Sequence, residues 1–234
     1  MMSDTHIPLP ERLRPRDLSE IIGQDHLLGQ HAPLRQMIDQ GHLPSIIFWG
    51  PPGVGKTTIA LLLAQAVDRP FVSLSALNTG VKELREIIAE SGDLLTPVVF
   101  IDEIHRFNKS QQDALLNAVE KGKITLIGAT TENPSFEVNS ALLSRCQVYT
   151  LNSLDQDAIQ TLLNKAIQTD AFLKERQIQI EEYDALFQFA AGDARKALNL
   201  IDLIASTFEA DVENIVNNAV TVKVAQQNIA RYDK

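Results

Sequence analysis

The residues best suited to chemistry lie at positions 50–57, where glycines, a lysine and a threonine follow a short apolar run. Their spacing, Gly-x-x-x-x-Gly-Lys-Thr, is that of a phosphate-binding loop. Backbone N–H groups of such a loop surround phosphate oxygens, and the N-terminus of the next helix favours negative charge. Lys56 would reach the β- and γ-phosphates, and the Thr57 hydroxyl would ligate Mg²⁺. The predicted phosphate-loop residues are Gly50, Pro51, Pro52, Gly53, Val54, Gly55, Lys56, Thr57 and Thr58.

Thr58 is counted here as the next residue of the helix, in preference to a second metal ligand. A second candidate site follows another apolar run, where Asp102 and Glu103 are adjacent. Ligands of open α/β sheets bind at the carboxyl ends of the strands. Asp102 would hold Mg²⁺ directly or through water, and Glu103 would orient and polarise an attacking water. Downstream of a phosphate loop, this acidic pair predicts nucleotide hydrolysis.

Alternating strands and helices must position these residues. The pattern predicts a three-layer α/β/α fold with a parallel sheet over residues 1–151. After residue 152 only helices are expected, which predicts a small all-α domain over 152–234. Ser110 is expected to cap the helix after the acidic pair, with Asp113 completing a capping box. The expected strands are 45–49, 71–74, 97–103, 124–130 and 147–151, and the expected later helices are 155–169, 180–191, 193–208 and 222–229.

Several polar residues keep more than one interpretation. Thr130 ends an expected buried strand and Asn133 follows it. The two residues either present a hydrogen-bond donor beside Asp102 or simply form a turn. Arg145 ends a short helix, where a cation offsets the helix dipole. Arg195 instead lies in the first turn of a helix, where a cation opposes the dipole, so its position suggests an anionic partner.

For three further residues, the sequence pattern alone indicates no catalytic or binding role. Lys82 and Arg85 lie three residues apart on one face of an expected helix, and a solvated face is the ordinary interpretation. His105 lies between the acidic pair and the next helix, where a hydrogen-bonded loop residue is the ordinary interpretation. None of these positions adds a candidate catalytic group.

Composition narrows the class of protein. With 44% hydrophobic and 22% charged residues, the 234-residue chain is typical of a globular protein. The formal charge of −9 argues against a generally basic nucleic-acid binder, so DNA contact would need a local basic patch or a pore built from several copies. No apolar run approaches the ~20 residues of a membrane span. The single cysteine, Cys146, and the absence of a signal-peptide pattern at the N-terminus predict a cytoplasmic protein with no membrane partner.

These motifs together resemble the AAA+ ATPases, and most closely the replication-associated recombination protein A family, whose eukaryotic relatives include the Werner-helicase-interacting ATPase. The resemblance covers nearly all of residues 10–234, and residues 128–136 are its most specific part. The other motifs are shared with clamp loaders and, more loosely, with the Holliday-junction branch-migration motor. They are residues 12–15, 22–25, 48–53, 100–107, 143–146 and 192–195.

The resemblance implies roles that the residues alone leave open. Thr130 would be the first sensor of the γ-phosphate, with Asn133 as the competing assignment. Arg145 would be the arginine finger acting on ATP in a neighbouring subunit, and Arg195 the second sensor, reaching from the helical lid. Residues 78–85 match a clamp-loader segment that faces DNA phosphates. The residues implied for the adenine pocket are Arg14, Pro15, Ile22 and Gly23, and those implied for DNA are Lys82 and Arg85.

The implied function is a Mg²⁺-dependent, DNA-stimulated ATPase at stalled or recombining replication forks, associated with the nucleoid. Its partners would be forks, single-strand/duplex junctions or DNA ends, with single-strand-binding protein as a further candidate. A clamp-loader subunit and a branch-migration motor are the enzymatic alternatives. A non-hydrolysing structural subunit is disfavoured because Lys56, Glu103 and Arg145 are all present. Family members continue into a C-terminal domain that forms oligomers, so homo-oligomers are expected of the longer protein and this chain is expected to lack that domain.

Overall fold

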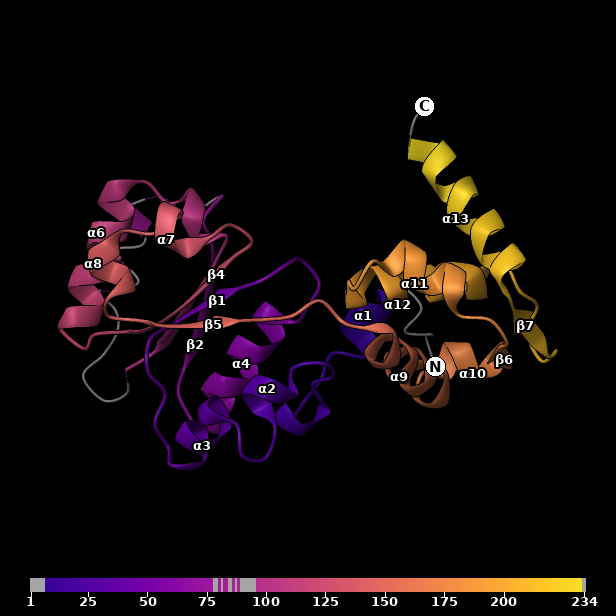
Figure 1. The fold of residues 1–234 in the computed structure, drawn as a ribbon, viewed down its shortest axis with the longest axis horizontal. Helices are drawn as coiled ribbons and strands as arrows, with labels where there is room; N and C mark the ends of the chain where they lie inside the picture. Colours follow the sequence, from indigo (N-terminus) through magenta and orange to yellow (C-terminus); the bar gives the residue numbers. More distant parts are fainter. Residues whose placement is uncertain are drawn as a thin grey trace. The chain divides into compact units, whose positions relative to one another are not determined.

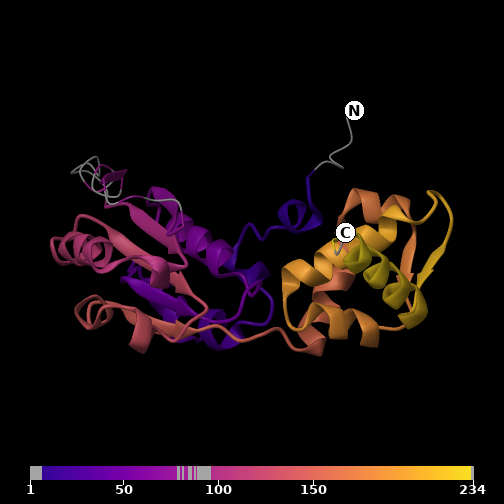
Figure 2. The ribbon, with the colours of Figure 1, turned by 90° about the horizontal axis from the view of Figure 1, so that it is seen from above.

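The computed structural model describes residues 7–77, 80, 82, 83, 86, 88 and 96–232. Contacts divide the chain into two compact units (Figure 1; Figure 2). One unit is Arg16–Asn152, and the other combines the described part of residues 1–15 with that of residues 153–234. The sequence-based division at residue 151 did not anticipate that the N-terminal residues belong with the C-terminal helices.

The unit Arg16–Asn152 contains a five-stranded parallel sheet in the order β2-β3-β4-β1-β5. The three central strands are rich in fully buried β-branched and aromatic residues, as expected of a parallel sheet covered on both faces. This confirms the predicted α/β sheet. The strands are β1 (Ile46–Trp49), β2 (Phe71–Ser75), β3 (Val98–Asp102), β4 (Thr125–Thr130) and β5 (Gln147–Thr150).

Helices cover both faces of this sheet (Figure 1). Helix α4 (Lys56–Ala66) contacts β2, β3 and β4 on one face. Helix α6 (Lys109–Glu120) contacts β4 and α8 (Ser140–Leu143) on the other. The remaining elements of this unit include η2 (Leu18–Glu20), α2 (Asp25–Leu28), α3 (Pro33–Asp39), η3 (Ile104–Arg106) and α7 (Pro134–Glu137).

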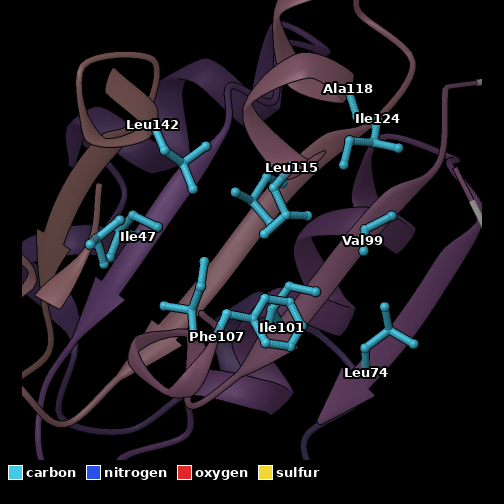
Figure 3. Close-up of a cluster of buried hydrophobic side chains, with 12 residues drawn as sticks. Ile47, Leu74, Val99, Ile101, Phe107, Leu115, Ala118, Ile124 and Leu142 are labelled. Carbon is cyan, nitrogen blue, oxygen red and sulfur yellow. The ribbon is translucent and has the colours of Figure 1, made fainter. Parts of the chain in front are cut away.

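A buried hydrophobic cluster joins the sheet to α6 and α8 (Figure 3). Alternate strand residues, such as Val99 and Ile101 of β3, point to this face, because side chains of a strand alternate between its two faces. Leu115 of α6 and Leu142 of α8 fill the space above them. The cluster therefore holds α6 and α8 against this face of the sheet.

Helix α6 begins two residues earlier than the sequence predicted. Its cap is Asn108, whose Oδ1 accepts the Gln111 N–H at 3.0 Å, while Gln111 Oε1 accepts the Asn108 N–H at 2.9 Å. The predicted cap, Ser110, is a helical residue. The prediction was wrong because both positions offer a capping residue with a polar partner three positions later, and asparagine is among the strongest caps.

The second unit is helical but also contains a two-stranded parallel sheet, β6 (Ile178–Ile180) with β7 (Asn214–Val216). The expectation of helices alone after residue 152 missed it, because three-residue strands are too short to show an alternating pattern. Among the described residues, no helix has the length and hydropathy needed to cross a membrane. The helices are α1 (Leu9–Arg12), α9 (Gln156–Thr169), α10 (Ala171–Glu175), α11 (Asp184–Ala190), α12 (Ala194–Ser206) and α13 (Asn218–Tyr232).

A partly buried ion-pair network, centred on the buried Asp170, explains why the N-terminal residues belong to this unit. Arg12 binds both carboxylate oxygens of Asp170, with Nε–Oδ2 at 2.8 Å and Nη2–Oδ1 at 3.1 Å. Its Nη2 also lies 3.0 Å from Asp202 Oδ1. The hydrogen bond to Asp170, more than any other contact, raises the pKa of the Arg12 guanidinium, and Asp202 adds to this. Arg12 therefore ties α1 to α10 and α12 as a permanently charged group.

Candidate nucleotide site

The phosphate loop follows β1 and runs into the N-terminus of α4. Gly53 and Gly55 have φ angles of 72° and 96°, in the left-handed region that glycine adopts without strain. Gly55 is the N-cap, so the first helical residues are Lys56 and Thr57. Because the first N–H groups of a helix have no partner within the helix, this loop presents backbone donors to an anion.

Lys56 is buried at the mouth of this loop. Its Nζ donates hydrogen bonds to the carbonyl oxygens of Gly50 at 2.7 Å and Pro51 at 2.8 Å. The ammonium group is therefore held over the loop backbone by oxygen acceptors. Phosphate oxygens are acceptors of the same kind with full negative charge, so a nucleotide would compete favourably for this group.

The strand register brings three chain segments to one edge of the sheet. Trp49 of β1 pairs with Thr130 of β4, and Ile101 of β3 pairs with Gly128 of β4. In addition, the Gly50 N–H donates to the Thr130 carbonyl at 3.1 Å. The start of the phosphate loop, the acidic pair and Thr130 therefore lie at the carboxyl ends of three adjacent central strands.

Asp102 ends β3, and Glu103 turns the chain sharply into η3. Glu103 has φ 54° and ψ 47°, a left-handed conformation that is uncommon for residues other than glycine. Among the contacts of the described residues, no hydrogen bond reaches its buried Oε2. His105 Nδ1 lies 3.2 Å from that oxygen, near enough for an ion pair but not aligned for a hydrogen bond. The carboxylate oxygen is thus close to a ring nitrogen that is aligned on Thr130 Oγ1 instead.

Thr130 is the fully buried last residue of β4. Its Oγ1 accepts the Glu132 N–H at 3.0 Å, lies 3.2 Å from the Glu132 carbonyl oxygen and lies 2.9 Å from His105 Nδ1. Asn133, the competing sensor residue, uses its Oδ1 to accept the Ser135 N–H at the cap of α7. Which of the two is the first sensor stays a prediction, but the Asn133 side chain already caps α7.

The predicted arginines lie at different places. Arg145 follows α8, with Nη2 at 2.9 Å from Glu120 Oε1 and Nη1 donating to Ser144 Oγ at 2.7 Å. Arg195 is exposed in the first turn of α12, in the other unit. Arg14 and Pro15 also belong to that unit, and Arg14 pairs with Glu11, whereas residues 22 and 23 belong to the sheet unit. The approach of any of these residues to a nucleotide stays a prediction.

The predicted DNA contacts receive no support from geometry. Lys82 is exposed, and its Nζ lies 3.7 Å from Glu86 Oε1, as in an ordinary surface pair. Arg85 lies outside the described residues. The role of both residues in DNA binding stays a prediction.

Two polar residues near the site were given no chemical role from the sequence. His105 contacts both Glu103 and Thr130, although the sequence indicated no role for it. Gln24 is 1% exposed, and its side-chain amide pairs with the backbone of Asn152 as a neighbouring strand would. Its Nε2 donates to the Asn152 carbonyl oxygen at 2.8 Å, and its Oε1 accepts the Asn152 N–H at 3.1 Å. Two signals were available in the sequence. His105 lies two residues after the acidic pair, Gln24 adjoins Gly23, and both belong to motifs that carry the resemblance, residues 100–107 and 22–25.

The chain is similar to a family of ATPases and to several known proteins. The pattern of the ATPase family associated with various cellular activities (AAA) matches residues 46–154. Replication-associated recombination protein A of Coxiella burnetii is 45% identical over 100% of this chain and 54% of its own length. The protein of that name from Escherichia coli K12 is 43% identical over 98% of this chain and 54% of its own length. ATPase WRNIP1 of Dictyostelium discoideum is 44% identical over 84% of this chain and 23% of its own length.

A solved structure gives the same fold. The Thermotoga maritima RuvB Holliday junction branch migration motor matches with a TM-score of 0.74 and 25% identity, over 92% of this chain and 72% of that one. The chain spans about half the length of the bacterial replication-associated recombination proteins it matches. With the phosphate loop and the acidic strand end inside the matched range, residues 46–154 belong to the AAA family of ATPases, and the chain as a whole is similar to the replication-associated recombination protein A group.

Proposed function

We propose that this chain binds ATP with Mg²⁺ at the phosphate loop and hydrolyses it. One observation carries the proposal: the phosphate loop, Asp102–Glu103 and Thr130 lie at the carboxyl ends of adjacent central strands. In this arrangement one bound triphosphate can meet the lysine, the carboxylates and the threonine hydroxyl together. The left-handed glycines of the loop and the buried Lys56 support phosphate as the ligand.

The residues present fit a magnesium ion held jointly with a nucleotide. Among the described residues there is no cluster of three or more His, Cys, Asp or Glu side chains that could cage a metal alone. Magnesium commonly takes one or two protein oxygens and completes its shell with phosphate oxygens and water. Thr57 and Asp102 would supply those protein oxygens. When bound, the ion offsets charge on the β- and γ-phosphates.

Each residue then has a distinct task in hydrolysis. Lys56 would exchange the carbonyl oxygens of Gly50 and Pro51 for phosphate oxygens, so its main contribution is to binding. Glu103 would hold the attacking water and polarise it, so its main contribution is to turnover. Thr130 would donate its hydroxyl toward the γ-phosphate as the first sensor. Residues 22 and 23, with Arg14 and Pro15, would complete the adenine pocket, and Arg195 would act as the second sensor.

Arg145 would act as an arginine finger on the nucleotide of a neighbouring copy. Its pair with Glu120 is about half exposed, and such surface pairs are weak enough to exchange for a phosphate. Mixing Arg145→Ala with Lys56→Ala protein should restore turnover, because the first supplies a competent pocket and the second supplies the finger. A mixture of Glu103→Gln with Lys56→Ala is the control, since neither pocket is competent. No rescue in the first mixture would rule out action between copies.

We further propose that hydrolysis is coupled to DNA at stalled or recombining replication forks. The names of the relatives support replication-associated recombination, and the likeness to a Holliday junction branch migration motor makes four-way junctions the second candidate substrate. Phosphate release should be measured with forks, four-way junctions, single strands and blunt duplexes. Stimulation greatest with forks supports the first candidate, and stimulation greatest with four-way junctions supports the second. Turnover unaffected by any DNA contradicts both.

Lys82 and Arg85 are the proposed phosphate contacts on DNA. Replacing both with alanine should weaken binding to all sequences alike, because phosphate contacts carry no sequence information. The slope of binding affinity against salt should fall by about one unit for each DNA phosphate that the side chains no longer neutralise. An unchanged slope would leave both residues on an ordinary solvated face.

A further inference from the structure

His105 lies where the catalytic carboxylate and the sensor threonine meet. It belongs to the 3₁₀ turn η3, which directly follows β3 and packs against β4. Ile104 packs directly on Gly128: a Cβ at that glycine would lie 2.8 Å from Ile104 Cδ1. The missing side chain at Gly128 therefore lets η3 approach β4 closely. As a result the His105 ring, whose side chain is 13% exposed, reaches Thr130 and Glu103 with one nitrogen.

The hydrogen bonds of Thr130 decide which atom carries the proton. Its Oγ1 accepts the Glu132 N–H and lies within donating distance of the Glu132 carbonyl oxygen. If the hydroxyl proton points to that carbonyl, His105 Nδ1 must be the donor at 2.9 Å. The Glu103 carboxylate at 3.2 Å favours the same assignment, because an unprotonated Nδ1 would face a negative oxygen. With this assignment, the ring places a single Nδ1–H between two acceptors, Thr130 Oγ1 and Glu103 Oε2.

We propose that His105 is a positioning residue that couples Thr130 to Glu103. Without nucleotide its Nδ1–H is aligned on Thr130, and Glu103 Oε2 accepts no hydrogen bond from the described residues. When the Thr130 side chain rotates to bring Oγ1 to a γ-phosphate, Oγ1 moves away from Nδ1, and the Nδ1–H swings to Glu103 Oε2, which is 3.2 Å away. That hydrogen bond fixes the carboxylate so that Oε1 faces the attacking water. The carboxylate is thus aligned only when the sensor is occupied.

This inference rests on the proposed function, because it assigns Glu103 to the water and Thr130 to the phosphate. It goes beyond it by giving His105 a task distinct from binding. Loss of a partner that orients a metal ligand commonly costs about 10–100-fold in activity, and we expect a similar factor for a group that orients the Glu103 carboxylate. Nucleotide affinity should be little changed, since the polar partners of His105 among the described residues are Thr130 and Glu103, and neither Lys56 nor the backbone of the phosphate loop is among them.

The test compares three substitutions of His105 with one of an exposed histidine. His105→Asn keeps an N–H near the position of Nδ1, whereas His105→Gln extends it beyond that position and His105→Leu removes it. ATP affinity should be equal in all three, and the turnover number should fall about 10–100-fold in Gln and Leu and be largely retained in Asn. The matched control, His42→Leu, changes an exposed side chain and should behave as wild type.

NMR of the chain with isotope-labelled histidine provides a readout independent of turnover. Of five histidines, the signal missing in His105→Asn assigns the ring. Nδ1 should carry the proton at about pH 8, and its signal should move when a non-hydrolysable ATP analogue is added. In Thr130→Val that response should be lost.

The outcomes separate this inference from the proposed function. Wild-type turnover in Glu103→Gln would overturn both. Loss of turnover in Glu103→Gln with full turnover in His105→Gln and His105→Leu would overturn the coupling alone. A proton on Nε2 instead of Nδ1 would do the same. If His105→Leu does not fold, the comparison of Asn with Gln still decides the question.

Discussion

Replacing Arg12 with methionine tests how α1 is held to the C-terminal helices. Methionine keeps most of the apolar stem, so the change removes the charge with little loss of packing. It leaves Asp170, whose side chain is 6% exposed, without its bidentate partner, while Asp202 is 27% exposed and stays hydrated. Breaking a buried pair by removing one partner costs about 3–5 kcal/mol. Asp170 keeps its hydrogen bond to the Leu173 N–H at 3.1 Å, so we expect the lower end, about 3 kcal/mol.

Urea denaturation followed by circular dichroism measures this cost as the change in the free energy of unfolding. Arg35→Met is the matched control, because Arg35 makes a surface pair with Asp39 whose side chains are 30% and 56% exposed. That variant should lose no more than about 0.5 kcal/mol. Equal stability losses in the two variants would refute the argument that burial makes the Arg12 network important.

Two further predictions concern packing and reactivity. Gly128→Ala would place a Cβ 2.7 Å from Ile47 Cδ1 and 2.8 Å from Ile104 Cδ1, so urea denaturation should show a loss of about 1–3 kcal/mol, and unchanged stability would contradict the close packing. Burial raises the pKa of the Cys146 thiol from 9.0 to about 12, which lowers its thiolate fraction at about pH 8 from roughly a tenth to roughly a ten-thousandth. A thiol reagent should therefore label native protein about a thousandfold more slowly than urea-unfolded protein, and equal rates would contradict that burial.

The central sheet could be predicted from sequence because several independent signals agree. Residues 46–49 and 98–101 are continuous apolar runs, and each is followed by residues that suit a strand end rather than a helix. A glycine loop that leads into a helix fixes the order strand, loop, helix. In this part of the chain, the secondary structure that the local sequence favours is the one that the folded sheet contains.

Other features depend on contacts that no local pattern encodes. Arg12 meets Asp170 and Asp202 across more than 150 residues of sequence, so nothing near α1 indicated its partners. The strands β6 and β7 are three residues each and gain stability only by pairing with one another. His105 acquires its contacts because Gly128, on a different strand, lets η3 approach. These features follow from packing of distant segments.

The division of labour between Lys56 and Glu103 is the sharpest test of the proposed nucleotide chemistry. ATP titration and single-turnover phosphate release should be measured on Lys56→Ala and Glu103→Gln, with His42→Leu as the unaffected control. Lys56→Ala should lose tight ATP binding, because it removes the charge beside the β- and γ-phosphates. Glu103→Gln should bind ATP like wild type and lose about 10²–10⁴-fold in turnover, the usual contribution of a positioned base. Ordinary turnover in Glu103→Gln, or tight ATP binding in Lys56→Ala, would contradict these roles.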